Sequence, residues 1–403
     1  MERTDRNEAM FARTRAMFDL PEGVIYLDGN SLGPLPRAAR ARLARATDEW
    51  QGKLIGGWNR AGWMAAPERL GDRIGALIGA PQGHVTVGDT LSLKLYQALA
   101  AALALAPGRR EVLTDTGNFP SDLYMAQGLL DTLGQGHRLR AVEPGEVLDA
   151  LGEDTAVLML TQVDYRTGRC HDMAALTRAA HAAGAVALWD LAHSAGAIEV
   201  DLAGAGADFA VGCTYKYLNA GPGAPAFIYV APRHAETAAT VLPGWLGHAA
   251  PFDFEPSYRP APGVARMRVG TPAVLQMAVL DAALDVWEGI SMADLRAASI
   301  RLSERFVAEV EARCPSLELA SPRDANARGS QVSFRHAEGH AVIQALIARG
   351  VVGDFRAPDL MRFGFAPLYL SVPEVTEAAG HLAEVLETRA WDRPEFRVRA
   401  RVT

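Results

Sequence analysis

Cysteine is scarce in this chain, and the few cysteines lie too far apart to form a recognisable set. Among 403 residues there are three, Cys170, Cys213 and Cys314. No two of them form a C-x-x-C pair, and any disulfide scheme would leave one unpaired. The spacing argues against a disulfide-rich scaffold and against a cysteine-based metal site, and we expect no metal. It fits a protein of a reducing compartment.

An excess of positive charge and a long apolar run are also missing. The 40 Lys and Arg residues face 47 Asp and Glu, a net charge of −7, which gives no electrostatic footprint for nucleic acid. The most apolar window, 98–106, is about half of the ~20 residues that cross a bilayer. The first residues, MERTDRNEAMFARTR, lack the apolar segment of a signal peptide. We therefore expect a cytoplasmic protein that binds neither nucleic acid nor a membrane.

The middle of the chain alternates short β-rich runs with Ala- and Leu-rich helical stretches, which is typical of a parallel sheet built from βαβ units. Runs such as AVLML and AVALW are continuously apolar, as expected of strands covered by helices on both faces. We predict a large α/β domain over 46–260 with a mostly parallel seven-stranded sheet. The candidate strands are 85–87, 111–114, 138–142, 156–160, 185–190, 209–212 and 227–230.

The pattern changes after a proline-rich stretch at 251–262. Thr271 and Pro272 have the residue types of an N-cap and a first helical turn, so a long helix is predicted to follow them. A second helix is predicted at 291–313. Two strand-like runs, 329–335 and 351–356, flank a predicted helix at 340–349. We predict that 261–403 forms a linking helix and a smaller C-terminal α+β domain, with an N-terminal segment, 1–45, that packs on this domain.

Asp190 and Lys216 each stand at the end of an apolar strand-like run. The carboxyl ends of parallel strands meet at one edge of a sheet, where ligands bind, and His193 follows Asp190 closely. Taken singly, Asp190 is equally well explained as a turn cap and Lys216 as a surface lysine. Together they meet the needs of pyridoxal phosphate, which takes a lysine amine for a Schiff base and a carboxylate that keeps its pyridine nitrogen protonated.

Three further elements would complete such a site. Thr90 and Ser92 precede an apolar helix whose N-terminal amides favour a phosphate, although a plain N-cap has the same pattern. Phe119 can stack on an aromatic ring or belong to the core. Arg362, in an otherwise apolar segment interpreted as a loop, can bind a substrate α-carboxylate, and a surface ion pair is its plainer interpretation.

These residues belong to longer motifs, through which the chain resembles the kynureninase family of fold type I, aspartate-aminotransferase-like pyridoxal phosphate enzymes. Two positions depart from the pattern: Asp164 stands where many relatives have Asn, and the TLS at 90–92 varies. The motifs cover most of the chain: YLDGNSLGPLP (26–36), FPSD (119–122), VDYRTGRCHDM (163–173), WDLAHSAGA (189–197), GCTYKYLNAGPGAPAF (212–227), GWLGH (244–248) and RVGTP (268–272).

The resemblance implies a homodimer with active sites near the subunit interface. It implies that pyridoxal 5′-phosphate is the cofactor and L-kynurenine the substrate, hydrolysed to anthranilate and L-alanine in tryptophan degradation. Lys216 would form the Schiff base, Asp190 would face the pyridinium, Tyr215 would donate a proton and Arg362 would bind the carboxylate. The other implied cofactor contacts are Leu91, Ser92, Phe119, Pro120, Ser121, Asp122, His193, Tyr215, Trp245 and Thr271.

For the aryl end of the substrate, we predict a pocket that contains Trp58, Gly270 and Thr271. The indole offers stacking area for an aniline ring, and glycine removes side-chain bulk. An alternative interpretation makes Trp58 an anchor of the dimer interface.

Other functions remain open at this stage. A cysteine desulfurase or selenocysteine lyase needs a reactive cysteine on a mobile loop and usually has His before its lysine, where this chain has Tyr215. An aminotransferase would share the fold. A nicotinamide-binding protein is disfavoured because no G-x-G-x-x-G follows the first strand. A non-catalytic binding protein is disfavoured by the joint presence of Lys216, Asp190 and Arg362.

Overall fold

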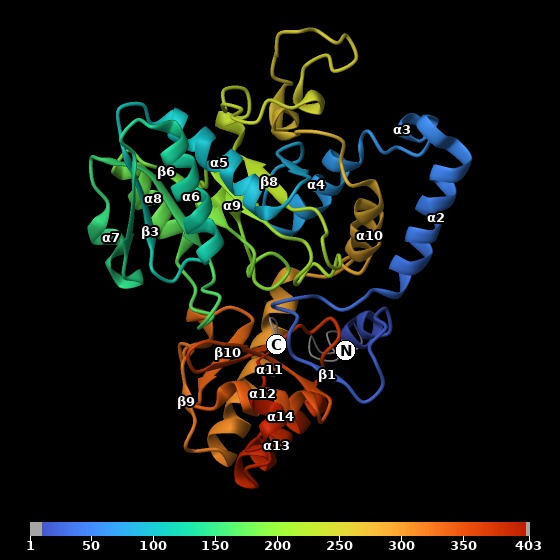
Figure 1. Ribbon diagram of the computed structural model, residues 1–403, viewed down its shortest axis with the longest axis vertical. Coiled ribbons are helices and arrows are strands. Elements are labelled where there is room, and N and C mark those ends of the chain that lie inside the picture. Colours follow the sequence, from blue (N-terminus) through green and yellow to red (C-terminus); the bar gives the residue numbers. More distant parts are fainter. Residues whose placement is uncertain (1–9, 400–403) are drawn as a thin grey trace.

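A seven-stranded sheet forms the centre of the larger domain in the computed structural model, which describes residues 10–399 (Figure 1). β8 runs antiparallel to both of its neighbours, and the other pairings are parallel, so the prediction of a mostly parallel seven-stranded sheet is confirmed. In spatial order the strands are β2 (Val85–Val87), β8 (Phe227–Val230), β7 (Phe209–Gly212), β6 (Val186–Asp190), β5 (Thr155–Thr161), β3 (Glu111–Asp115) and β4 (Arg138–Val142).

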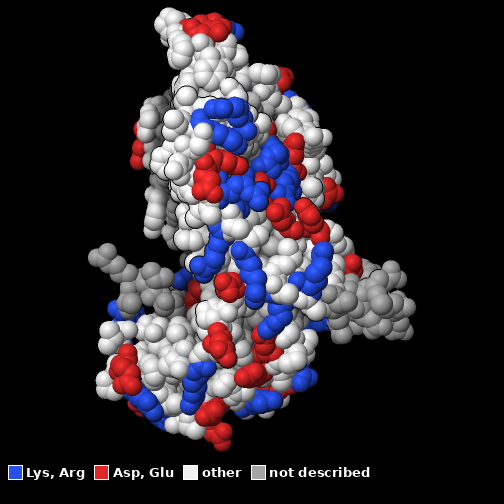
Figure 2. All heavy atoms as spheres, turned by 90° about the vertical axis from the view of Figure 1, so that its right-hand side faces the viewer, with Lys and Arg blue, Asp and Glu red and all other residues white. Residues whose placement is uncertain are grey.

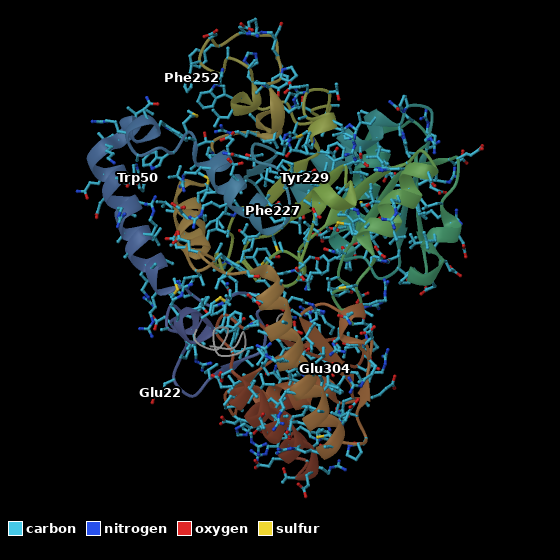
Figure 3. The ribbon with its side chains drawn as sticks, turned by 180° about the vertical axis from the view of Figure 1, so that it is seen from behind. Glu22, Trp50, Phe227, Tyr229, Phe252 and Glu304 are labelled. Atoms are coloured by element: carbon cyan, nitrogen blue, oxygen red, sulfur yellow. The ribbon has the colours of Figure 1, made fainter. Side chains whose placement is uncertain are left out.

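Both faces of this sheet are buried, because successive side chains of a strand point to opposite faces. In β6, Ala187 and Trp189 belong to one core, and Val186 and Leu188 belong to another. Phe227 and Tyr229 of β8 face the first of these cores inside the large domain (Figure 3). Burial on both sides explains the continuous apolar runs in the sequence.

Helices cover the two faces of the sheet. Residues of α5 (Leu91–Leu105) and α6 (Pro120–Leu133) pack in the core that contains Val186. Residues of α4 (Ala66–Leu77), α8 (Met173–Ala182) and the short helices α7 (Val147–Ala150) and α9 (Leu202–Ala205) pack in the core that contains Trp189. The starts of α5 and α6 follow the ends of β2 and β3, which brings both helix N-termini to the edge of the sheet that carries Asp190.

The smaller domain contains a four-stranded antiparallel sheet below the large domain (Figure 1). Its strands in spatial order are β12 (Asp354–Arg356), β13 (Leu360–Gly364), β10 (Gln331–Arg335) and β9 (Glu318–Leu319). Its helices are α11 (Met292–Arg313), α12 (Gly339–Ile347), α13 (Val372–Glu387) and α14 (Pro394–Arg397). The run predicted as one strand at 351–356 divides at Gly353 into β11 (Val351–Val352) and β12, which join different sheets.

The helix expected directly after Thr271 and Pro272 begins later, so that cap assignment is wrong. α10 spans Val274–Asp285, and its N-cap is Ala273, which makes no side-chain capping bond. The next helix begins where it was predicted to begin, because Ser291 caps α11 by accepting a hydrogen bond from the Asp294 amide.

The N-terminal segment connects the two domains. β1 (Ile25–Tyr26) pairs in parallel with β11 of the small domain. The following helix, α2 (Arg37–Lys53), lies beside α10 at the edge of the large domain, and the short α3 (Gly57–Arg60) follows at the far end of α2 (Figure 1). Asp281 of α10 forms ion pairs of 2.7 Å with Arg69 and Arg73 of α4. The face with α2 toward the viewer carries basic and acidic side chains beside one another (Figure 2).

Asp208 is a buried carboxylate that ties β7 to two histidines. Its oxygens lie 2.8 Å from His181 Nε2 and 2.7 Å from His234 Nε2, and one accepts the Ala187 amide at 2.7 Å. Burial alone would raise the pKa of Asp208, but these hydrogen bonds and Arg233 outweigh it and hold the pKa below its ordinary value of 3.8.

Replacing Asp208 with asparagine should lower the free energy of unfolding at neutral pH by about 1 to 3 kcal/mol. A carboxyl whose pKa is depressed by folding stabilises the protein above the pKa of the unfolded chain, 3.8, and this contribution is lost as the pH falls toward the folded pKa. Urea unfolding at several pH values should therefore show a difference between the two proteins that shrinks below pH 3.8. Asp131→Asn, on the exposed side of α6, is the matched control. A difference independent of pH would contradict the account.

Candidate active site

The carboxyl ends of β6 and β7 bring Asp190 and Lys216 together, as the sequence predicted from their positions. Asp190 ends β6, and Lys216 lies in the turn that follows β7. Asp190 Oδ1 accepts the Ala192 amide at 2.8 Å, and its Oδ2 accepts the Thr161 hydroxyl at 3.3 Å. The carboxylate therefore caps its turn, which confirms that interpretation, and it also lies within reach of the Lys216 charge, so its role in a cofactor site stays a prediction.

Lys216 has one polar partner and two aromatic neighbours. Its Nζ lies 3.0 Å from His193 Nε2. The same atom lies 5.9 Å from the centre of the Phe119 ring and 5.8 Å from the centre of the Tyr215 ring. Phe119 is 40% exposed, so it is not a core residue, and its ring meets Tyr165 edge-on at 5.1 Å. The Lys216 amine therefore lies between aromatic rings, and the site is exposed to solvent on the side of Phe119.

Two buried carboxyls lie beside this amine. Burial, followed by the charge of Asp190, raises the pKa of Asp122 well above its ordinary value, and the positive charge of Lys216 opposes this. Burial also raises the pKa of Asp190, against the opposing effects of Lys216 and the Ala192 amide. Asp122 Oδ2 is buried and has no hydrogen-bond partner among the described residues. The Asp122 Oδ2 atom can therefore still accept a hydrogen bond from a cationic or donor group.

The N-termini of α5 and α6 meet at the same edge. Ser92, in the first turn of α5, lies 3.1 Å from Ser121, in the first turn of α6, between the two hydroxyl oxygens. Thr90 is the N-cap of α5 and accepts the Leu93 amide at 3.4 Å, so the plain capping role also holds. Leu91, Pro120 and Ser121 are half-buried here. Two helix N-termini with paired hydroxyls provide amide donors for an anion.

Arg362 is in a strand and fully buried, so both the loop and the surface ion pair expected from the sequence are wrong. It lies on β13, which pairs with β10 and β12. Its Nε donates to Asp354 Oδ1 at 2.7 Å, and its Nη2 donates to the Ser31 hydroxyl at 3.0 Å and to Asp354. Its Nη1 donates to the Tyr165 carbonyl. The guanidinium therefore joins the N-terminal segment, the small domain and the large domain.

Sequence reasoning missed the acidic partners of this arginine. Burial and the charge of Asp354 raise the pKa of Asp28 to about 7, so Asp28 is an acid that titrates near neutrality beside the guanidinium. The motif YLDGNSLGPLP contains both Asp28 and Ser31, and that motif was the available signal. No sequence signal pointed to Asp354, because it lies in a strand whose alternation of polar and apolar residues is ordinary.

Trp58, Gly270 and Thr271 do not share one pocket within the chain, contrary to the prediction. Gly270 and Thr271, both exposed, line a cavity of about 250 Å³ together with Thr90. The other residue, Trp58, lines a separate cavity of about 400 Å³ whose walls also contain Ile55, Asn59, Met64, Trp245, Leu246 and Phe252. Trp245 also lines this second cavity.

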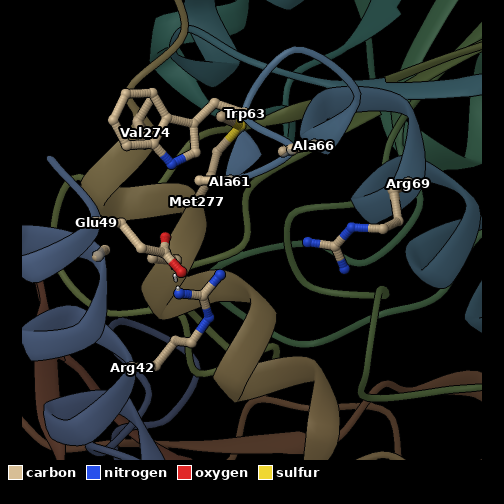
Figure 4. Close-up of a pocket in the computed structure, with 11 residues that line it drawn as sticks. Arg42, Glu49, Ala61, Trp63, Ala66, Arg69, Val274 and Met277 are labelled. Carbon is tan, nitrogen blue, oxygen red and sulfur yellow. Dashed lines mark ion pairs between the residues drawn. The ribbon is translucent and has the colours of Figure 1, made fainter. Parts of the chain in front are cut away.

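A third cavity, of about 80 Å³, lies between α2, α4 and α10, where Arg42 and Glu49 face each other at 3.8 Å (Figure 4). None of the predicted site residues lines it. Across residues 10–399, no helix combines the length and apolar character that a membrane crossing requires. The same residues include no group of three His, Cys, Asp or Glu side chains placed to hold a metal ion.

Comparisons of the sequence with known proteins point to one family. The family model described as the kynureninase C-terminal domain matches residues 295–382. A kynureninase of Pseudomonas fluorescens is 50% identical over 415 residues, covering 99% of this chain and 100% of that protein. A kynureninase of Burkholderia pseudomallei strain 1106a is 50% identical over 407 residues, covering 99% of this chain and 98% of that protein.

Among solved structures, the apo cysteine desulfurase of Thermococcus onnurineus NA1 superposes with a TM-score of 0.80 and 19% identity, covering 94% of this chain and 98% of that one. The cysteine desulfurase CsdA of Escherichia coli gives a TM-score of 0.77 and 19% identity, with 94% and 98% covered. At this identity the likeness shows the fold alone, and it confirms the fold class predicted from the sequence.

Proposed function

Since the chain belongs to the kynureninase family, we propose that it hydrolyses the Cβ–Cγ bond of L-kynurenine to give anthranilate and L-alanine. The observation that carries this proposal is the 50% identity to kynureninases over 99% of the chain. The site is consistent with it, because Lys216, Asp190 and the paired helix N-termini lie at one edge of the sheet. The reaction belongs to tryptophan degradation, and we place the enzyme in the cytoplasm.

Pyridoxal 5′-phosphate is the cofactor of this enzyme family, and the residues present fit it. The unpartnered Asp122 Oδ2 and the Asp190 carboxylate can face a protonated ring nitrogen, which would supply the positive charge that this pair lacks. Ser92, Ser121 and the amides of α5 and α6 would hold the phosphate, and Lys216 the aldehyde carbon. When bound, this group withdraws electrons from the bonds at Cα and Cβ of the substrate.

Arg362 and Lys216 would bind and deprotonate the substrate. Four of the guanidinium donor contacts of Arg362 are already made within the chain, to Asp354 twice, Ser31 and Tyr165. A substrate carboxylate must therefore use the fifth donor or displace Ser31 or the Tyr165 carbonyl. Lys216 Nζ would then take the proton from Cα as the general base.

Tyr215 would supply the proton that Cβ needs when the carbon–carbon bond breaks. Burial, followed by the nearby Cys213, raises the pKa of the Tyr215 phenol, so the hydroxyl carries its proton at neutral pH and is available as the proton donor. Water adds to the γ-carbonyl carbon, the Cβ–Cγ bond breaks, and Cβ receives the phenolic proton. Anthranilate leaves with the oxygen from water, and the remaining three carbons become L-alanine.

Incubation with L-kynurenine, followed by anthranilate fluorescence, tests the proposal. L-Cysteine is the matched alternative substrate, because the fold is shared with cysteine desulfurases. Anthranilate formation with no sulfide from cysteine supports the proposal. Sulfide formation without any anthranilate would assign the chain to the other chemistry.

We expect a preference for L-kynurenine over 3-hydroxykynurenine. The cavity beside Trp58 has mostly apolar walls, with Asn59 as its single amide, and a ring hydroxyl buried without a partner loses binding energy. If the aryl ring lies there, the ratio of the two kcat/KM values should favour kynurenine by roughly tenfold or more. Measuring the two kcat/KM values side by side tests this preference. A ratio near one would indicate that the aryl ring binds at a site with a polar partner for the hydroxyl.

We also propose a homodimer with active sites near the interface. Large apolar side chains are exposed on α2, on the turn before α3 and on the segment 245–254. Trp50 and Phe252 stand at the outer edges of the molecule (Figure 3). The exposed set consists of Trp50, Leu54, Ile55, Trp245, Phe252 and Phe254. Exposed apolar groups in this number are typical of a surface that a partner covers. Sedimentation of the purified protein should give twice the mass of one chain.

A further inference from the structure

His193 sits between a residue of the large domain and a residue of the small domain. Its Nε2 lies 3.0 Å from Lys216 Nζ, and its Nδ1 lies 3.2 Å from Oε1 of Gln331, on β10. Both His193 and Gln331 are buried. A neutral imidazole carries one proton, so one ring nitrogen donates and the other accepts. Which nitrogen does which depends on Gln331.

The orientation of the Gln331 amide is fixed by two backbone carbonyls. Its Nε2 lies 3.3 Å from the Asp164 carbonyl oxygen and 3.0 Å from the Tyr165 carbonyl oxygen. Carbonyls only accept, so the amide nitrogen must face them, and the amide oxygen must face His193. An amide oxygen also only accepts, which requires a proton on His193 Nδ1.

We infer that Gln331 is a positioning residue that holds His193 as the tautomer protonated at Nδ1, with the lone pair of Nε2 directed at the Lys216 amine. The sequence around Gln331 shows nothing but a strand. The opposite tautomer would place the lone pair of Nδ1 against the Gln331 amide oxygen, and it would point the N–H of Nε2 at the Lys216 amine. It would also leave the Gln331 oxygen without a donor.

The electrostatics around His193 support a neutral ring. Burial lowers the pKa of His193 well below its ordinary value, and the positive charges of Lys216 and Arg362 lower it further. A neutral imidazole can differ only in which of its two nitrogens carries the proton. The tautomer therefore decides whether Lys216 meets an acceptor or a donor.

This contact also ties the lysine to the small domain. The Tyr165 carbonyl accepts from Gln331 and from Arg362, so both small-domain residues hold the same loop. If a substrate carboxylate displaces the Tyr165 carbonyl from Arg362, the hydrogen bond from the Gln331 amide to that carbonyl will also change, and this amide orients His193. This catalytic consequence rests on the proposed function, whereas the tautomer itself does not.

The test reads the tautomer directly in the full-length chain with ¹⁵N-labelled histidine. Lys216 in its ammonium form selects the same tautomer, so the measurement is made in Lys216→Met, which removes that influence. His193→Gln identifies the His193 signal by its loss. We expect the proton on Nδ1 in Lys216→Met. Adding Gln331→Met should shift the ring toward a mixture of tautomers, while Gln344→Met, the same change on α12, should leave it unaltered.

A proton on Nε2 in Lys216→Met, or no change on adding Gln331→Met, would overturn the inference. Should the double variant fail to fold, Gln331→Glu serves instead. Its carboxyl keeps an acceptor at Nδ1, so His193 should keep its proton on that nitrogen. A proton on Nε2 alone in this variant would also overturn the inference.

The loaded wild-type enzyme supplies a second readout. Gln331→Met should lower kcat on the order of 10- to 100-fold, as loss of an orienting partner does for a metal-bound histidine, with a smaller change in KM. If no form of the protein releases anthranilate, the proposed function is wrong. The tautomer inference is then judged by the ¹⁵N measurement alone.

Discussion

Replacing Lys216 with alanine should abolish anthranilate release from L-kynurenine, with a loss of at least about 10³-fold in kcat. The chain contains only three lysines, Lys53, Lys94 and Lys216. Lys94 is buried, and its amine is bound by Asp89 at 2.9 Å, by Gln97 at 3.0 Å and by the Met267 carbonyl at 2.8 Å. Neither of the other two lysines can therefore replace the amine beside Asp190.

The measurement combines turnover with the visible absorbance band of lysine-bound pyridoxal phosphate. Lys53→Ala, at the exposed end of α2, is the control and should keep both properties. A Lys216→Ala protein that retains the band and the parent turnover would show that Lys216 does not hold the cofactor.

Replacing Arg362 with alanine should both destabilise the protein and weaken substrate binding. The substitution leaves Asp354 buried without its main partner, which costs about 3 to 5 kcal/mol of unfolding free energy. Loss of a buried carboxylate contact should add roughly 2 to 5 kcal/mol to the free energy of substrate binding, so KM should rise more than tenfold. Thermal unfolding and steady-state kinetics measure the two effects.

Two companion variants separate stability from binding. Arg362→Lys keeps the charge beside Asp354 but loses the planar fork, so KM should rise with a smaller loss of stability. Arg356→Ala removes a more exposed arginine that pairs with the same Asp354 at 2.8 Å, and it should change stability by about 1 kcal/mol or less. An unchanged KM in Arg362→Lys, together with a raised KM in Arg356→Ala, would assign the carboxylate to Arg356.

The sequence was sufficient for those site residues that stand at strand ends. Asp190 and Lys216 follow apolar runs, and parallel strands bring their ends to one edge whatever the details of packing. Ser92 was accessible for a similar reason, because it lies in the first turn of a helix that leaves this edge, whereas Ser121 was implied only by the family resemblance. Local pattern and topology together determine these positions.

Residues placed by contacts between distant segments were not accessible in this way. Arg362 reads as an isolated charge in an apolar segment, and its burial becomes clear only when Asp354 and Ser31 are brought beside it. Trp58 and Thr271 were assigned to one pocket from sequence motifs, yet they line different cavities within the chain. Thr271 was also expected to cap α10, but the helix begins at Val274. Residue type alone did not fix that boundary.

Hydrolysis of L-kynurenine in water enriched with ¹⁸O tests the central claim most directly. If Cβ–Cγ cleavage is hydrolytic, one ¹⁸O atom should enter the carboxylate of anthranilate, none should enter L-alanine, and the two products should form in equal amounts. Mass spectrometry of both products from one reaction gives all three quantities. Absence of anthranilate, or an amino-group transfer product without alanine, would contradict the assignment of this chain as a kynurenine hydrolase.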